Sequence, residues 1–177
     1  MHKRWMPAAS ALALMLTVTI APSVRADWLK GPDNGDDPFK GKRHSAMAIE
    51  LPGFALTFTC SNPDDLELAF VAPEKVTHEQ MQTMSGAPIK LLVIIDDQPK
   101  IEFEAELGAT MNMHVRIATS GDELVPVFKA AAAAKRRVAI GTEFNGKMLW
   151  TRSFSSAGSR RVLGPLLSAC KLDANPS

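Results

Sequence analysis

The sequence contains no tyrosine, only two cysteines and no excess of either charge. The lack of tyrosine argues against a carbohydrate-binding or antibody-like surface, because such surfaces depend on rings that combine an apolar body with a polar tip. The formal net charge is +1, whereas a nucleic-acid-binding domain needs a basic face. No apolar run reaches the roughly 20 residues of a transmembrane helix. These absences argue against a nucleic-acid partner and against a membrane-spanning protein.

Residues 1–26 have the pattern of a secretory signal peptide. A basic start is followed by an apolar run from Ala8 to Ile20, and small residues occupy the third and first positions before Asp27. This order predicts cleavage between Ala26 and Asp27. An uncleaved anchor or a buried helix is the alternative. We therefore expect a periplasmic or secreted protein that meets the membrane only during export.

Cys60 and Cys170 both follow the predicted cleavage site. Exported proteins meet an oxidising environment, where an even number of cysteines pairs by default. The separation of 110 residues differs from the spacing of a redox Cys-x-x-Cys motif and from that of a zinc site. The sequence therefore predicts one structural disulfide, which closes a long loop and stabilises the domain by up to about 5 kcal/mol.

Alternating apolar and polar residues predict mainly β-structure after an irregular lead-in over residues 27–43. Turn sequences separate the predicted strands, and Asn145-Gly146 is the strongest hairpin signal among them. The apolar residues placed on inner strand faces are Met47, Ile49 and Leu51; Phe54, Leu56, Phe58 and Cys60; Leu66, Leu68 and Phe70; Ile101, Phe103 and Ala105; and Met111, Met113, Val115 and Ile117.

Three helices are predicted among the strands. Thr77 and Gln80 fit a capping box for a short helix over residues 77–84. Asp122 is expected to cap a helix that ends in an alanine run, and Ser159 to cap a last helix that turns Cys170 toward the core. Pro165 is expected to strain or kink that last helix.

Runs of strands with appended helices indicate an α+β fold. We expect an antiparallel sheet or a small sandwich, with one helix before the last hairpin and a C-terminal helix pinned by the disulfide. Residues 44–172 are expected to form a single globular domain, followed by a tail over residues 173–177.

The residues give no indication of a catalytic, metal or cofactor site. His44, His78 and His114 stand apart and lack the spacing of metal ligands. The acidic stretch over residues 33–37 lacks the alternating ligands of a calcium loop. The Glu102, Glu104 and Glu106 row is interpreted as the solvent-facing side of a strand rather than as paired catalytic carboxylates. Nucleophile motifs of the hydrolase type are absent from the sequence.

Two tryptophans follow the predicted cleavage site, and large rings of this kind often anchor a partner. Trp28 lies in the lead-in, which is expected to be flexible, and is the better candidate for contact with a partner. Trp150 shares a strand face with Met148, so packing in the core is favoured for it.

Several framework segments follow one another in a definite order. A strand over residues 56–60 ends in cysteine, a strand ending in Asp96-Asp97 precedes a proline, and a Phe-Ser-x-x-Gly segment at Phe154 precedes a helix that ends at Cys170. In this order the stretch from Asp36 to Cys170 resembles the small periplasmic accessory proteins associated with type VI secretion. The resemblance implies a similar exported one-disulfide fold. It consists of framework positions, so no functional residue is carried over from it.

Together these observations predict an exported, non-enzymatic accessory or protein-binding domain with a protein of the cell envelope as its partner. The resemblance implies a link to a secretion system. A small envelope hydrolase or an enzyme inhibitor is the alternative. An enzyme would gather titratable groups in a pocket, whereas a binding domain would present an apolar patch or a sheet edge.

Overall fold

The computed structural model describes residues 26–31, 34–37, 41–61, 65–84 and 86–172. The predicted signal peptide, apart from Ala26, and the predicted tail lie outside these ranges. Signal cleavage before Asp27 therefore stays a prediction.

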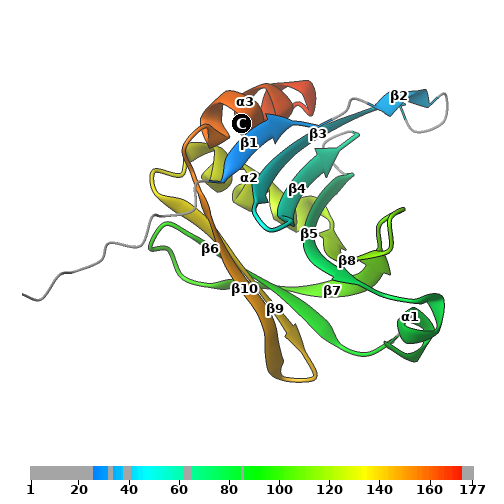
Figure 1. Cartoon of the computed structure of the whole chain (residues 1–177). Coiled ribbons are helices and arrows are strands. Elements are labelled where there is room, and N and C mark those ends of the chain that lie inside the picture. The colour runs from blue at the N-terminus through cyan, green and yellow to red at the C-terminus, as the bar shows by residue number, and fades with distance from the viewer. Residues whose placement is uncertain (1–25, 32–33, 38–40, 62–64, 85, 173–177) are drawn as a thin grey trace, which may run out of the picture.

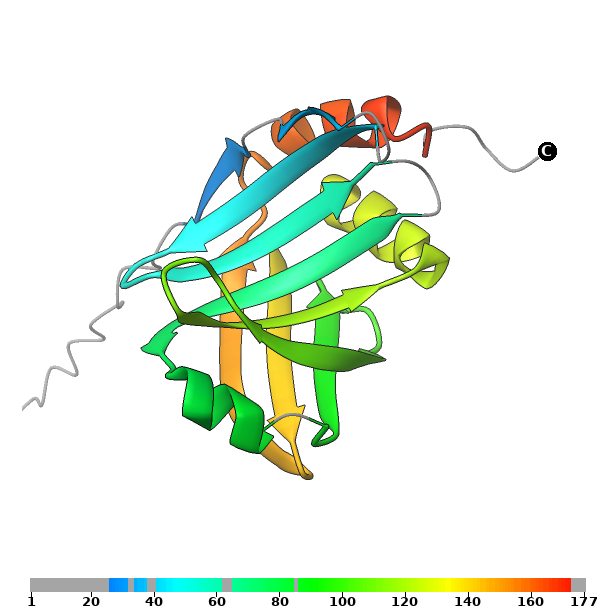
Figure 2. The same ribbon diagram turned by 90° about the vertical axis from the view of Figure 1, so that its right-hand side faces the viewer.

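Ten strands of the described chain form an antiparallel sheet that curls into a half-barrel (Figure 1, Figure 2). Their order along the sheet is β1-β3-β4-β5-β8-β7-β6-β9-β10, and β2 pairs with β3 beside β1. The predicted antiparallel sheet is confirmed, whereas the small sandwich stays a prediction. The strands are β1 (Asp27–Lys30), β2 (Asn34–Asp37), β3 (Gly41–Glu50), β4 (Phe54–Cys60), β5 (Leu66–Lys75), β6 (Ile89–Ile95), β7 (Ile101–Ala109), β8 (His114–Ser120), β9 (Arg137–Phe144) and β10 (Lys147–Ser155).

Helices join and cover these strands. Within the described residues they are α1 (His78–Met84), a short 3₁₀ helix (Asp122–Leu124), α2 (Val125–Ala133) and α3 (Ser159–Ala169). α2 precedes the last hairpin and α3 follows it, as the sequence predicted, so the α+β class is confirmed. In Figure 1, α2 and α3 lie at the same end of the curled sheet, while α1 lies at the opposite end.

Apolar side chains fill the inner face of the sheet. Phe54, Leu56 and Phe58 are at most 3% exposed, as the alternation in β4 predicted. Phe128 of α2 meets Phe58 edge to face, with ring centroids 5.0 Å apart. This geometry stabilises aromatic pairs beyond their buried area. Trp150 of β10 is half-buried beside Phe70 and donates its Nε1–H to Glu74 Oε1 at 3.2 Å, so strands from both halves of the sheet meet across the core.

The inner face of β3 is the opposite of the one predicted. Ala46 and Ala48 are 0% exposed, whereas Met47 and Ile49 are only half-buried. Ala46 lies opposite Phe58 in the register of β3 and β4. The strand turns its small residues inward because large rings on neighbouring strands already fill the space there.

The start of β8 also differs from the prediction. Met111 is fully exposed, and Met113 has a positive φ of 62°. The N–H of Met113 donates to the carbonyl of Thr110 at 2.9 Å, which closes a tight turn before β8 begins at His114. A local turn therefore replaces the first three residues of the predicted strand.

Of the three predicted helix caps, the structure confirms one. Thr77 and Gln80 form the predicted capping box, with reciprocal hydrogen bonds of 2.8 and 3.2 Å. Asp122 begins the 3₁₀ helix instead of capping α2 with its side chain. Ser159 is the first residue of α3, and Gly158 occupies the cap position with φ 98°. The chain turns there through a left-handed conformation that glycine adopts without strain.

A disulfide joins Cys60 to Cys170, as predicted. The two Cα atoms are 6.2 Å apart, and both residues are 1% exposed. The bond links the end of β4 to the residue that follows α3. A disulfide of this kind is consistent with an exported protein or another oxidising compartment.

Candidate functional site

A groove lies between α3 and the strands β1 and β3; we call it the α3 groove. Figure 1 shows α3 lying along β1 and the start of β3. The groove has a volume of about 510 Å³, within the range of about 300–1,000 Å³ that small-molecule sites occupy. Its lining is mainly apolar, and the apolar residues are Trp28, Leu29, Val162, Pro165, Leu166 and Ala169.

The register of β1 places Trp28 at the floor of this groove. β1 pairs with β3, and Trp28 lies opposite Ala48. The small alanine leaves room for the indole ring, which packs beside Phe58 with centroids 5.9 Å apart. The indole N–H donates to the backbone carbonyl of Ser155 at 2.6 Å. Trp28 therefore ties the first strand of the sheet to the end of β10.

Two predictions for the lead-in are corrected by this arrangement. Residues 27–30 are a paired strand and not irregular chain. Trp28 is 3% exposed, so its ring belongs to the core and is not an accessible contact for a partner. Residues 27–30 form a paired strand because Trp28 supplies a ring that the inner face of β3, with its alanines, does not.

α3 forms the second wall of the groove. The helix runs on to Ala169 although Pro165 lies inside it. Gly164 comes directly before the proline, and its lack of a Cβ relieves the clash that a proline imposes on the preceding helical residue. The face of α3 with Leu163 and Leu167 enters the core, while Val162, Pro165 and Ala169 line the groove.

Basic side chains border the apolar lining. Arg161 of α3 and Lys42 of β3 are exposed and lie on opposite walls. Lys30 and His44 also line the groove, and each makes a further interaction. No described residue of the lining is an aspartate or glutamate. The mouth of the groove therefore carries positive charge.

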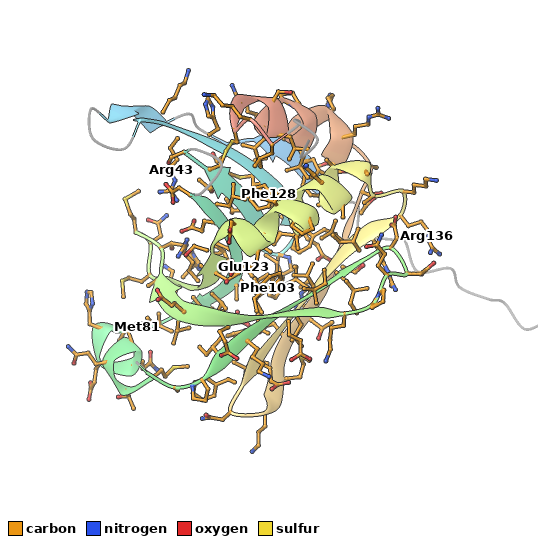
Figure 3. The ribbon with its side chains drawn as sticks, turned by 180° about the vertical axis from the view of Figure 1, so that it is seen from behind. Arg43, Met81, Phe103, Glu123, Phe128 and Arg136 are labelled. Atoms are coloured by element: carbon orange, nitrogen blue, oxygen red, sulfur yellow. A yellow bond between two sulfur atoms is a disulfide. The ribbon has the colours of Figure 1, made fainter. Side chains whose placement is uncertain are left out.

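A second, polar groove lies over β7 and β8, where Figure 3 labels Phe103 and Glu123. Glu67 Oε1 forms ion pairs with Arg43 Nη2 at 3.1 Å and with Arg116 Nη2 at 2.6 Å. Glu102 is held by the ammonium groups of Lys100 at 2.6 Å and Lys90 at 3.2 Å. The exposed Glu102 and Glu104 agree with the predicted solvent-facing row.

The cations around Glu102 determine its protonation. Hydrogen bonds from Lys100 and then Lys90 lower the pKa of Glu102, and the hydrogen bond to Glu102 raises the pKa of Lys90. Glu102 is therefore held as a carboxylate and does not have the raised pKa of a general acid.

The three histidines lie in separate places. His44 lines the α3 groove, His78 begins α1, and Nδ1 of His114 lies 2.9 Å from the carbonyl oxygen of Pro73. Among the residues that the structure describes, no group of three His, Cys, Asp or Glu side chains is arranged to hold a metal ion. None of the described helices has the length and apolar character needed to cross a membrane.

The α3 groove was not predicted from the sequence. Its apolar wall on α3 follows the helical spacing of Val162, Pro165 and Ala169, which could have indicated a second apolar stripe. The opposite wall comes from a stretch interpreted as irregular, so no periodicity placed Lys42 beside that stripe. Comparison of the chain with protein-family models, with curated proteins and with solved structures finds no match.

Proposed function

We propose that this chain is an exported, non-enzymatic accessory domain that acts by binding, with a protein of the cell envelope as its partner. The observation that carries the proposal is the α3 groove, which combines an apolar lining with a basic mouth. An exposed apolar surface bordered by polar residues is typical of an interaction site. Leu29, which is 47% exposed at the groove, offers an apolar contact to the partner.

Two further observations support the setting. The Cys60–Cys170 disulfide fits an oxidising compartment. The resemblance of Asp36 to Cys170 to type VI secretion accessory proteins supports a place at the cell envelope, and we propose the link to such a system on that resemblance. The alternative of a small hydrolase or inhibitor gains no support from Glu67 and Glu102 in the polar groove over β7 and β8, because cations engage both carboxylates.

Site-specific photo-cross-linking in cells tests this proposal. A photoreactive amino acid replaces Leu29 in the exported protein, and the matched control carries it at Leu149, which is similarly exposed at 42% on the last hairpin. We expect one envelope protein to be cross-linked from position 29 and not from position 149. Equal products from both positions, or none from position 29, would contradict the proposal. An envelope protein outside the secretion machinery would remove only the type VI link.

A further inference from the structure

The interior of the α3 groove has the properties of a site for a hydrocarbon chain. Of its apolar side chains, Leu29, Pro165 and Ala169 are exposed and Val162 is half-buried, while Trp28 and Leu166 lie buried beneath them. The indole N–H of Trp28 is already bonded to the carbonyl of Ser155. A hydrocarbon chain brings no polar groups that need new partners when it is buried. The apolar interior of the groove therefore suits an acyl chain.

The basic side chains at the mouth of the groove favour a ligand whose headgroup is negatively charged. Arg161 and Lys42 lie on opposite walls and are both exposed. Neither makes an ion pair with another described residue. A guanidinium can bind a carboxylate with two parallel hydrogen bonds. An anionic headgroup at the mouth would thus be contacted by cations from both walls.

We infer that the α3 groove binds a free, single-chain anionic amphiphile of the fatty-acid type. Its chain lies between α3 and the strands β1 and β3, against the accessible side chains of Leu29, Val162, Pro165 and Ala169. Its carboxylate lies at Arg161 and Lys42. This inference rests on the proposed function in one respect, namely that the α3 groove is a binding site. The amphiphile is a separate molecule and does not have to be part of the protein partner.

Titration of the disulfide-bonded exported protein with dodecanoate tests the inference. Binding is measured by calorimetry and by Trp28 emission in a Trp150→Phe background, at concentrations below micelle formation. We expect saturable binding with one site, and binding of octanoate at least about tenfold weaker because each buried methylene contributes to affinity. Dodecyltrimethylammonium has the same chain with the opposite charge, and we expect it to bind at least about tenfold more weakly.

Three substitutions locate the site. Arg161→Glu is expected to weaken dodecanoate binding by at least about tenfold. Arg160→Glu is the matched control, because Arg160 is the exposed neighbour of Arg161 and does not line the groove; we expect its affinity to stay within about twofold of the parent. Ala169→Leu adds bulk at an exposed position of the lining and should weaken binding without disturbing the core.

The outcomes separate the ligand from the protein partner. No saturable dodecanoate binding, equal binding of the cationic amphiphile, or binding unchanged by both Arg161→Glu and Ala169→Leu would overturn the inference. A cross-link from Leu29 to an envelope protein would stand in each of those cases. If dodecanoate binds as expected but position 29 gives no cross-link, the ligand inference holds and the protein-partner proposal fails.

Discussion

The half-buried carboxylate of Asp96 joins two segments of the chain through hydrogen bonds. It occupies the turn after β6 with a positive φ of 54°, and its oxygens accept the backbone N–H groups of Lys135, Arg136 and Arg137 at 2.9, 2.8 and 3.0 Å. The neighbouring Asp97 forms an ion pair with Arg136, which is labelled in Figure 3. Together these contacts join the β6–β7 turn to the segment between α2 and β9.

The three backbone hydrogen bonds, led by that of Lys135, lower the pKa of Asp96. A carboxylate with a lowered pKa in the folded state stabilises the fold above its unfolded pKa of about 3.9. That contribution is lost as the pH falls through the folded pKa. The contribution of Asp96 to stability is therefore complete at neutral pH and disappears in acid.

Replacing Asp96 by Asn should lower the melting temperature by a few degrees at pH 7. The amide cannot accept three N–H bonds with the same strength as the charged carboxylate. Thermal unfolding followed by circular dichroism at pH 7 and below pH 4 measures the effect, and the difference between the two proteins should shrink in acid. Asp97→Asn is the control and should have a smaller effect, because an exposed ion pair contributes little. A pH-independent difference would contradict this role of the carboxylate.

Among the elements, α1 is the least dependent on the core. None of its residues is buried, so its stability comes from local hydrogen bonds, chiefly the capping box of Thr77 and Gln80. An isolated helix of this length is marginal in water. The cap should therefore decide whether α1 is formed, with little effect on the rest of the sheet.

Thr77→Ala should speed amide hydrogen exchange in residues 78–84 by about fivefold, since losing an N-cap costs about 1 kcal/mol. The global melting temperature should stay nearly unchanged because α1 buries no side chain. Hydrogen exchange followed by mass spectrometry gives the local rate. Thr83→Ala is the control, because the Thr83 hydroxyl donates to the carbonyl of Glu79 within the helix and does not cap it. A global loss of stability in Thr77→Ala would show that α1 is coupled to the core.

Sequence patterns predicted elements well where the determining contacts are local. The Asn145-Gly146 hairpin forms as expected, with both residues at positive φ, and the alternation in β4 identified its buried face. β3 was assigned the wrong inner face because its alanines are matched to rings on β1 and β4, which its own sequence does not contain. Ser159 was misassigned as a cap because the preceding Gly158 provides the turn.

At the scale of the whole molecule, the disulfide could be predicted but the strand order could not. Two inward cysteines and an oxidising compartment were enough to predict the Cys60–Cys170 bond. The pairing of β5 with β8 and of β6 with β9 depends on contacts between distant segments. The alternation of apolar and polar residues does not show which strands pair with each other. The α3 groove depends on that arrangement, so it appears only in the folded molecule.

Removing the disulfide in a Cys60→Ala/Cys170→Ala variant should lower the free energy of unfolding by about 2–5 kcal/mol. The bond closes a loop between residues that are 110 positions apart, which restricts the unfolded chain. Urea unfolding with and without a reducing agent measures the loss. Reduction should destabilise the parent protein and leave the double variant unchanged. A parent protein with two free thiols, or one equally stable after reduction, would contradict a structural role for the bond.

The same disulfide has a consequence for the timing of biogenesis. Cys60 emerges from the ribosome long before Cys170, which lies 110 residues later. β1 likewise makes its last contacts only after Ser155 has been synthesised, because the Ser155 carbonyl accepts the hydrogen bond of the Trp28 indole. The early strands are therefore made before the segments that complete their packing. Closure of the domain belongs to the final stage of synthesis, when the last helix becomes available.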